Sequence, residues 1–224
     1  MSLDLSISSD LTGRVRLGLL VLGGVTVRES DAALAAEVDA ECSSLKARYG
    51  DGKSVEVPGA ADARALYKAL GLDPTKTRPS NEALLRRALK GESLYRINTL
   101  VDAMNLCSLR AQLPFGLYDI DQVRPPVQLR RGTTGEGYEG IRKGRVSVED
   151  RPVLVDALGP FGNPTSDSAR TMVTLATRNA LVVVYAPAGY SPGRLTGVLD
   201  DTATTLTRCC GGQVAEKRLL PAAG

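Results

Sequence analysis

Helical periodicity dominates the first half of this chain, whereas the second half consists mainly of strand-like segments. Apolar residues spaced three and four apart predict helices at residues 31–48, 60–70, 80–90 and 98–111, and one late helix at about 192–209. Ser80 is expected to be the N-cap of the third helix. Short apolar runs between turn residues predict strands at 15–21, 127–131, 146–148, 153–156, 170–174, 181–186 and 213–219. Helices grouped early and strands late are typical of α+β proteins. We therefore expect one compact α+β domain over residues 1–224, with at most a hinge near Pro74–Pro79.

Length and charge set limits on the class of protein. A chain of 224 residues can bury a sizeable core, and its net charge of +3 permits an anionic partner without indicating a dedicated DNA-binding protein. The longest apolar run, Leu17–Val27, contains three glycines and is too short to span a bilayer. The first sixteen positions hold Asp4, Asp10 and several serines, where a signal peptide would need an apolar segment. We expect a cytoplasmic protein without a membrane partner, and the sequence indicates no oligomeric state.

The sequence contains no histidine, and this absence restricts the possible chemistry. It excludes Ser-His-Asp and Cys-His nucleophilic sites, a histidine general base and histidine-based zinc sites. The four cysteines lack C-x-x-C spacing and are expected to be reduced, buried thiols: Cys42, Cys107, Cys209 and Cys210. Carboxylates are scattered, so we expect neither a metal site nor a cofactor.

Glycine-rich motifs offer no phosphate loop. Gly18, Gly23 and Gly24 lack the Walker spacing and the Lys-Ser/Thr pair that should follow it. The segment Gly132–Gly137 lies between strand-like runs, where a hairpin turn is the better interpretation.

A line of polar residues lies on the helix predicted from Asn98: Asn98, Asp102, Asn105 and Ser108. An unpartnered buried polar group costs roughly 1–3 kcal/mol, so each of these needs a partner. The partner could be the backbone, another member of the line or a ligand, and an amide network that holds the following loop is as reasonable as a binding site. Two further segments stand out. Leu113–Asp121 carries Asp119 and Asp121 on either side of one residue in a turn-like context, and Phe161–Val173 is rich in small hydrogen-bonding groups that suit either a ligand loop or a well-capped connector.

The segment Arg78–Val123 resembles the B3/B4 domain of the bacterial phenylalanyl-tRNA synthetase beta subunit, and is most similar to proteins that carry this domain alone. The matching motifs are Arg-Ile-Asn, Leu-Val-Asp, Asn, Ser-Leu and Leu-Pro-x-Gly-x-Tyr-Asp, found at Arg96–Asn98, Leu100–Asp102, Asn105, Ser108–Leu109 and Leu113–Asp119. Weaker likeness follows in "VQLRRGTTGEGYEGI" and "SDSARTMVTLATRNALVVVYA", so that the resemblance covers about residues 67–186. Residues 1–59 form an N-terminal extension without an assigned motif.

The resemblance implies a three-layer fold, with helices packed on the β-rich half, and a pocket for the aminoacylated 3′ end of a tRNA. In the synthetase this domain hydrolyses tyrosine wrongly attached to phenylalanine tRNA. The first expectation is therefore an editing-like hydrolase that acts in trans on mischarged tRNA. A non-catalytic module that binds tRNA or an amino acid is about equally supported, and a metabolic enzyme of unrelated chemistry is a minor third possibility.

Two departures from the family pattern affect these expectations. The histidine of the family's Pro-x-His-x-Phe-Asp turn falls at Gly116, and the glutamate after its Phe-Gly-Gly turn has no match in Phe161–Thr165. We expect the pocket to be wider at Gly116 than in the synthetase. Hydrolysis without histidine would depend on an oriented water and on backbone donors.

The resemblance assigns candidate residues to three roles. Asp167 is the candidate catalytic base, or the partner of an α-amino group, although it could instead pair with Arg170 and brace the loop. The candidate substrate-binding residues are Asn98, Asp102, Asn105, Gly116, Thr165, Ser166 and Arg170. The candidate RNA-binding residues, which could equally form a solvated strand-and-turn face, are Arg130, Arg131, Arg142, Lys143 and Arg145.

Overall fold

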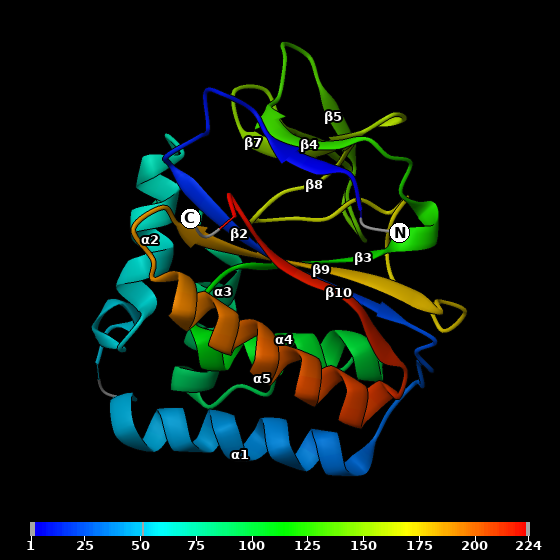
Figure 1. Cartoon of the computed structure of the whole chain (residues 1–224). Helices are drawn as coiled ribbons and strands as arrows, with labels where there is room; N and C mark the ends of the chain where they lie inside the picture. The colour runs from blue at the N-terminus through cyan, green and yellow to red at the C-terminus, as the bar shows by residue number, and fades with distance from the viewer. Residues whose placement is uncertain (1–2, 51, 223–224) are drawn as a thin grey trace.

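The computed structural model describes residues 3–50 and 52–222, which form three stacked layers (Figure 1). Helices form one outer layer, a central four-stranded sheet lies beneath them, and a second four-stranded sheet forms the other outer layer. The long helices are α1 (Ala32–Tyr49), α2 (Ala60–Ala69), α3 (Ser80–Lys90), α4 (Thr99–Ala111) and α5 (Pro192–Cys210). This arrangement confirms the predicted three-layer α+β fold. No helix within the described residues is long and apolar enough to cross a membrane.

The central sheet has the strand order β10–β2–β9–β3, and all of its neighbours are antiparallel. Its strands are β2 (Val15–Gly23), β3 (Phe115–Asp119), β9 (Asn179–Pro187) and β10 (Gln213–Leu220). Strand β2, from the N-terminal region that carries no motif, therefore lies inside the sheet between β10 and β9. The N-terminal extension is a structural part of the central layer.

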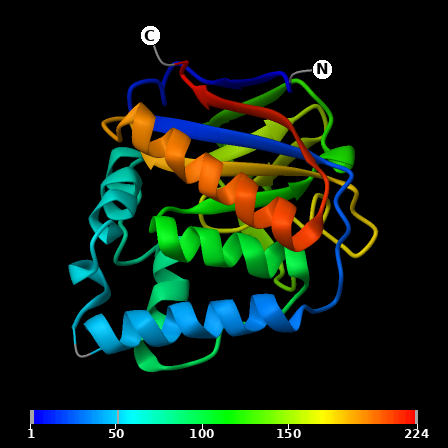
Figure 2. The same cartoon turned by 60° about the horizontal axis from the view of Figure 1, so that its bottom comes forward.

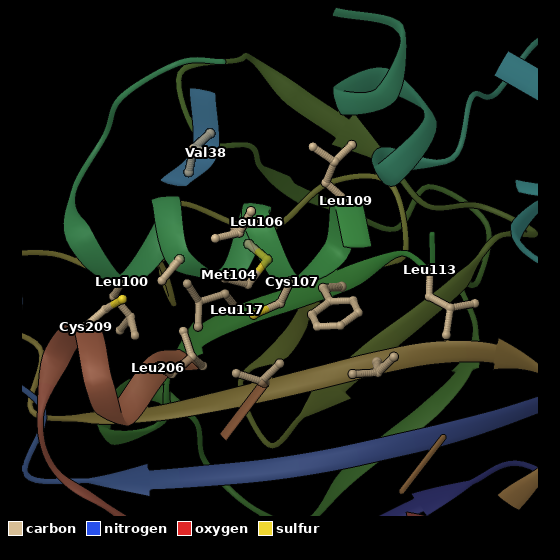
Figure 3. Close-up of a cluster of buried hydrophobic side chains, with 14 of the residues drawn as sticks. Val38, Leu100, Met104, Leu106, Cys107, Leu109, Leu113, Leu117, Leu206 and Cys209 are labelled. Atoms are coloured by element: carbon tan, nitrogen blue, oxygen red, sulfur yellow. The ribbon is translucent and has the colours of Figure 1, made fainter. Parts of the chain in front are cut away.

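The strands β2, β9 and β3 of the central sheet are buried on both faces, because one layer covers each face and the side chains alternate between the two. On β9, Val182 and Val184 point to the helices, whereas Leu181, Val183 and Tyr185 point to the second sheet. The helix-side core receives Met104 and Leu106 from α4 and Leu206 from α5 (Figure 3). The sequence pattern thus produces two separate apolar cores around one sheet.

The second sheet has the order β1–β4–β7–β8 and is joined to a small hairpin, β5–β6. Its strands are β1 (Leu5–Ile7), β4 (Val127–Arg131), β7 (Pro152–Asp156) and β8 (Gly159–Gly162), and the hairpin strands are β5 (Gly137–Glu139) and β6 (Arg145–Ser147). Single 3-10 turns lie at Ser54–Glu56 and Ile120–Gln122. Figure 2 shows α4 and α5 next to the central sheet and α1 outside α4, all on the side away from this second sheet.

Three local predictions were wrong. The segment Leu113–Asp121, interpreted as a turn, contains the fully buried strand β3. The segment Arg170–Thr174, interpreted as a strand, is a loop that meets the free edge of β3 where Asp119 N donates to Thr171 O at 2.9 Å. Ser80, expected to cap α3, is its first helical residue; Pro79 holds the cap position and the Ser80 hydroxyl bonds no backbone N–H there.

Candidate functional site

The polar line on α4 mainly secures the two ends of that helix. Asn98 caps the N-terminus by accepting from Val101 N at 3.0 Å, and Asp102 Oδ1 accepts from Ile97 N at 3.0 Å. Burial raises the pKa of Asp102. At the other end, Ser108 Oγ donates to Leu113 O at 2.7 Å. These three side chains are buried and satisfied by backbone groups.

Asn105 differs from its neighbours on the line. Its half-buried amide makes no hydrogen bond with any described residue, and it faces a cavity of about 190 Å³ between α4 and the loop after β8. The polar members of that cavity's lining are Ser80, Asn105, Ser108, Asn163, Thr165, Ser166 and Asp167, and its apolar members are Leu84, Met104, Phe115 and Ile141. This polar compartment brings together three of the predicted substrate-binding residues, Asn105, Thr165 and Ser166, with Asp167.

A second cavity, of about 720 Å³, adjoins the first and is mainly apolar. Asn98 and Arg142 contribute to its lining, and the apolar members include Ile97, Val101, Leu117, Met172, Val173 and Leu175. The exposed fractions of Ile97, Met172 and Leu175 are 47%, 39% and 45%, so apolar side chains face solvent at the rim. Exposed apolar side chains gathered around a hollow are typical of a binding site.

The two compartments meet at Asp167, which lines both of them together with Met104 and Ile141. Asp167 Oδ2 accepts from Leu117 N at 3.5 Å, whereas Oδ1 is buried and has no hydrogen-bond partner within the described residues. Burial raises the pKa of Asp167 to about 7, despite the opposing effects of the Tyr118 hydroxyl, the Leu117 N–H and the charge of Lys143. A carboxyl group with this pKa is divided between its two protonation states at neutral pH.

Hydrogen bonds made by the side chains of Asn163 and Tyr67 hold the loop that carries Asp167 in place. Asn163 Oδ1 accepts from Thr165 N and Ser166 N at 2.8 and 2.9 Å. The hydroxyl of Tyr67 lies 2.9 Å from both Pro164 O and Thr165 Oγ1. These contacts fix the backbone on which Asp167 is presented to the cleft.

Gly116 does not widen the cleft, contrary to the sequence-based expectation. It lies on β3 with its Cα facing the second sheet, outside the linings of both compartments. A Cβ at Gly116, and equally one at Gly162, would collide with the hydroxyl group of Tyr118. The space that a side chain at 116 would occupy is therefore filled by Tyr118, which is fully buried next to Phe161.

Arg170 does not pair with Asp167, so that alternative is wrong. Its guanidinium forms a bidentate ion pair with Asp156, at 2.9 and 3.0 Å, and lies over the ring of Phe161. Arg170 is thereby bound at the end of β7, and it does not line either of the two compartments. Its predicted role in substrate binding has no support in this geometry.

The family profile described as "B3/4 domain" matches residues 62–206, which is more than half of the chain. The chain belongs to the B3/4 domain family. Its matched region contains α4, β3, the loop after β8 and β9, and so includes every residue of the cleft except Glu29.

One solved structure similar to this B3/4 domain protein is an N-terminal fragment of the phenylalanyl-tRNA synthetase beta-subunit from Pyrococcus horikoshii. The two share 12% sequence identity with a TM-score of 0.48, and the alignment covers 99% of this chain. The chain spans 55% of the length of that fragment. No curated protein matches the sequence.

The predicted RNA-binding residues of this B3/4 domain fall into two groups. Arg130 is held in an ion pair with Glu136 at 2.7 Å, Arg131 donates to Leu70 O and Asp150 O, and Arg145 donates to Gly135 O. Arg142 and Lys143, in contrast, are exposed on the turn between β5 and β6, next to Ile141 at the cleft. Arg142 has no hydrogen bond or ion pair among the described residues, and Lys143 Nζ lies 3.3 Å from Ser166 Oγ.

Sequence reasoning missed several cleft residues because their types carry no chemical signal. Ser80 was expected only to cap a helix, and Met104 and Ile141 carry no polar group, yet all three line the cleft. Met172 and Leu175 lie in the loop that was predicted to begin as a strand. Among the described residues, no group of three or more His, Cys, Asp or Glu side chains could hold a metal ion.

Proposed function

We propose that this B3/4 domain protein binds the aminoacylated 3′ end of a tRNA in the cleft between α4 and the loop 163–175, and hydrolyses a mischarged ester in trans. The observation that supports this most directly is Asp167, whose buried Oδ1 has no partner among the described residues and lies where the two compartments meet. Buried acceptors are normally satisfied, so a free one in a cleft is available to a water or a substrate.

In this proposal Asp167 acts as the general base. Its ionised carboxylate takes a proton from a bound water, and the water oxygen attacks the carbonyl carbon of the ester. The bond to the ribose oxygen then breaks, and that oxygen leaves with the proton that Asp167 took from the water, which restores the carboxylate. General base catalysis contributes about 10²–10⁴-fold, and a pKa of about 7 suits a base that works at neutral pH.

The surroundings of Asp167 suit the phosphates and the nucleobase of such a substrate. The exposed cations Arg142 and Lys143 are placed to meet phosphates, and the apolar rim offers surfaces for a nucleobase. Family membership and the motif likeness to an editing domain support tRNA as the source of both groups.

A non-catalytic binding module is the second candidate. It is favoured by the positions at which the family's histidine and glutamate are missing, Gly116 and the segment Phe161–Thr165. Such a module would use the same cleft but would leave the ester intact.

A panel of tRNAs charged with different amino acids separates the two candidates. We expect release of at least one amino acid at a rate that depends on Asp167, with the rate rising as the pH passes through 7. Measurable tRNA binding without deacylation of any species would leave only the binding module. Absence of both binding and deacylation would reject the tRNA proposal as a whole.

A further inference from the structure

We infer that the smaller compartment receives a short amino-acid side chain with a hydroxyl or amide group, while the larger compartment receives the terminal nucleoside. This inference rests on the proposed function and names its substrate class. It follows from the contrast between the two cavities, which share Asp167 but differ in size and in the unpartnered polar groups that line the smaller one.

The smaller compartment holds an unusual number of unpartnered polar groups. Ser80 Oγ and Asp167 Oδ1 are buried without a hydrogen-bond partner in the described chain, and the Asn105 amide also lacks one. They come from three different elements, α3, the loop after β8 and α4, and converge on one cavity. Leaving a buried polar group unpartnered reduces stability, and a ligand with matching donors and acceptors would recover that loss. An apolar side chain in the same place would leave them unpaired.

The volume of this compartment limits what it can hold. At about 190 Å³ it is smaller than the roughly 300–1,000 Å³ of a typical small-molecule site, so it suits one part of a ligand. A short side chain such as that of threonine or asparagine matches both its size and its chemistry.

The walls of the larger compartment are mainly apolar. Val101, Leu117 and Met172 give it apolar walls, and Arg142 lies at its edge. Flat nucleobases stack on apolar and aromatic surfaces, and arginine binds the phosphate that follows. With the nucleoside there and the side chain in the polar compartment, the ester bond lies at the shared boundary, beside Asp167.

Stable amide analogues test this assignment without turnover. We would measure binding of 3′-aminoacylamino-3′-deoxyadenosine that carries threonine, valine, asparagine or leucine. Threonine and valine are nearly equal in shape, as are asparagine and leucine, so each pair isolates the polar group. We expect the threonyl and asparaginyl analogues to bind at least tenfold more tightly than their apolar partners. Equal affinity, tighter binding of the apolar analogues, or no binding of any analogue would overturn the inference.

Two variants test whether the smaller compartment causes the preference for polar side chains. Asn105→Leu and Ser80→Ala should each reduce the threonyl-to-valyl ratio about threefold or more, because the valyl analogue no longer leaves that polar group unpaired. Ser44→Ala, on the exposed side of α1, is the matched control and should leave the ratio unaltered. Thermal melting checks that each variant is folded. If both folded variants keep the full ratio, the polar compartment is not the side-chain site.

Hydrolysis of the corresponding charged tRNAs is measured separately. Discrimination among the analogues without any hydrolysis would uphold the compartment assignment and reject the hydrolase. Hydrolysis that is equally fast for threonyl and valyl esters would uphold the hydrolase and reject the assignment.

Discussion

Asp156 and Asp167 lie on either side of β8, and their carboxylates have opposite environments. Asp156, whose side chain has no solvent exposure, accepts from Arg124 N at 2.8 Å, from Leu158 N at 2.9 Å and from both terminal nitrogens of Arg170. Asp167 has a single backbone contact at 3.5 Å and one oxygen with no partner in the described residues. The carboxylate of Asp156 thus has donors for both oxygens, whereas that of Asp167, eleven positions later, keeps one oxygen without a donor among the described residues.

The contrast separates a structural role from a functional one. A buried carboxylate surrounded by donors stabilises the loop that it joins, and it offers nothing to a ligand. A buried carboxylate with a free oxygen reduces stability, and such a cost is common where a group must react or bind. The following predictions test whether these two aspartates differ as their environments indicate.

The largest effect is expected from Asp156→Ala. The change leaves Arg170 and two backbone N–H groups without their acceptor, and should lower the free energy of unfolding by about 3 kcal/mol, as measured by urea unfolding. Asp201→Ala is the control, because Asp201 is exposed on α5 and should change stability by less than about 0.5 kcal/mol. Equal stability of the two variants would show that the ion pair does not hold the loop.

Asp167 should make stability depend on pH. Its pKa is raised from 3.8 to about 7 in the folded protein, so between these values the unfolded chain has released a proton that the folded protein retains. Stability relative to Asp167→Asn should therefore be greatest below pH 4, fall by on the order of 3 kcal/mol as the pH rises to 7, and remain level above it. Unfolding curves of both proteins at pH 4 and pH 8 measure this; parallel stabilities would contradict a raised pKa.

Asp167→Asn should also remove activity while preserving the fold. Loss of the general base is expected to reduce deacylation about 100-fold, and the residual rate should no longer increase through pH 7. Single-turnover deacylation at several pH values provides the measurement. Full activity in the folded variant would mean that an oriented water and backbone donors are sufficient.

The smallest effect concerns the cations at the cleft. Reversing Arg142 and Lys143 together to glutamate should weaken tRNA binding and reduce the slope of log affinity against log salt by about 1–2, because two phosphate contacts are lost. Lys68 and Lys76, both exposed and free of described ion pairs, provide a control pair for the same reversal. If both double variants respond alike, general charge rather than the cleft determines binding.

Much of the fold could be predicted because its signals are local. Asn98 caps α4 as its position indicated, and the stripes of α1 and α5 give the right helices. Strands β3 and β8 were missed because they are short and contain glycines, which fit a turn as well as a strand. The strand predicted at Arg170–Thr174 failed because only one of its carbonyls, that of Thr171, meets the edge of β3.

The site was harder to predict because its partners are distant in sequence. Asp167 could be singled out as an ionisable group in a polar loop, but nothing local shows that Arg170 is bound by Asp156, fourteen positions away. The error at Gly116 has a similar origin. On a strand, residues 116 and 118 share a face, so the space beside the glycine belongs to Tyr118 rather than to the cleft.

The position of β2 has a consequence for how this protein is made. Its register pairs Val15 with Pro187 and Leu20 with Lys217, so the strand must wait for partners synthesised about 170 to 200 residues later. Until then, leucines destined for both cores remain exposed on the nascent chain, open to chaperones and to aggregation. Ribosome-bound chains that lack β9 and β10 cannot close the central sheet, and folding is completed only when nearly all of the chain has emerged.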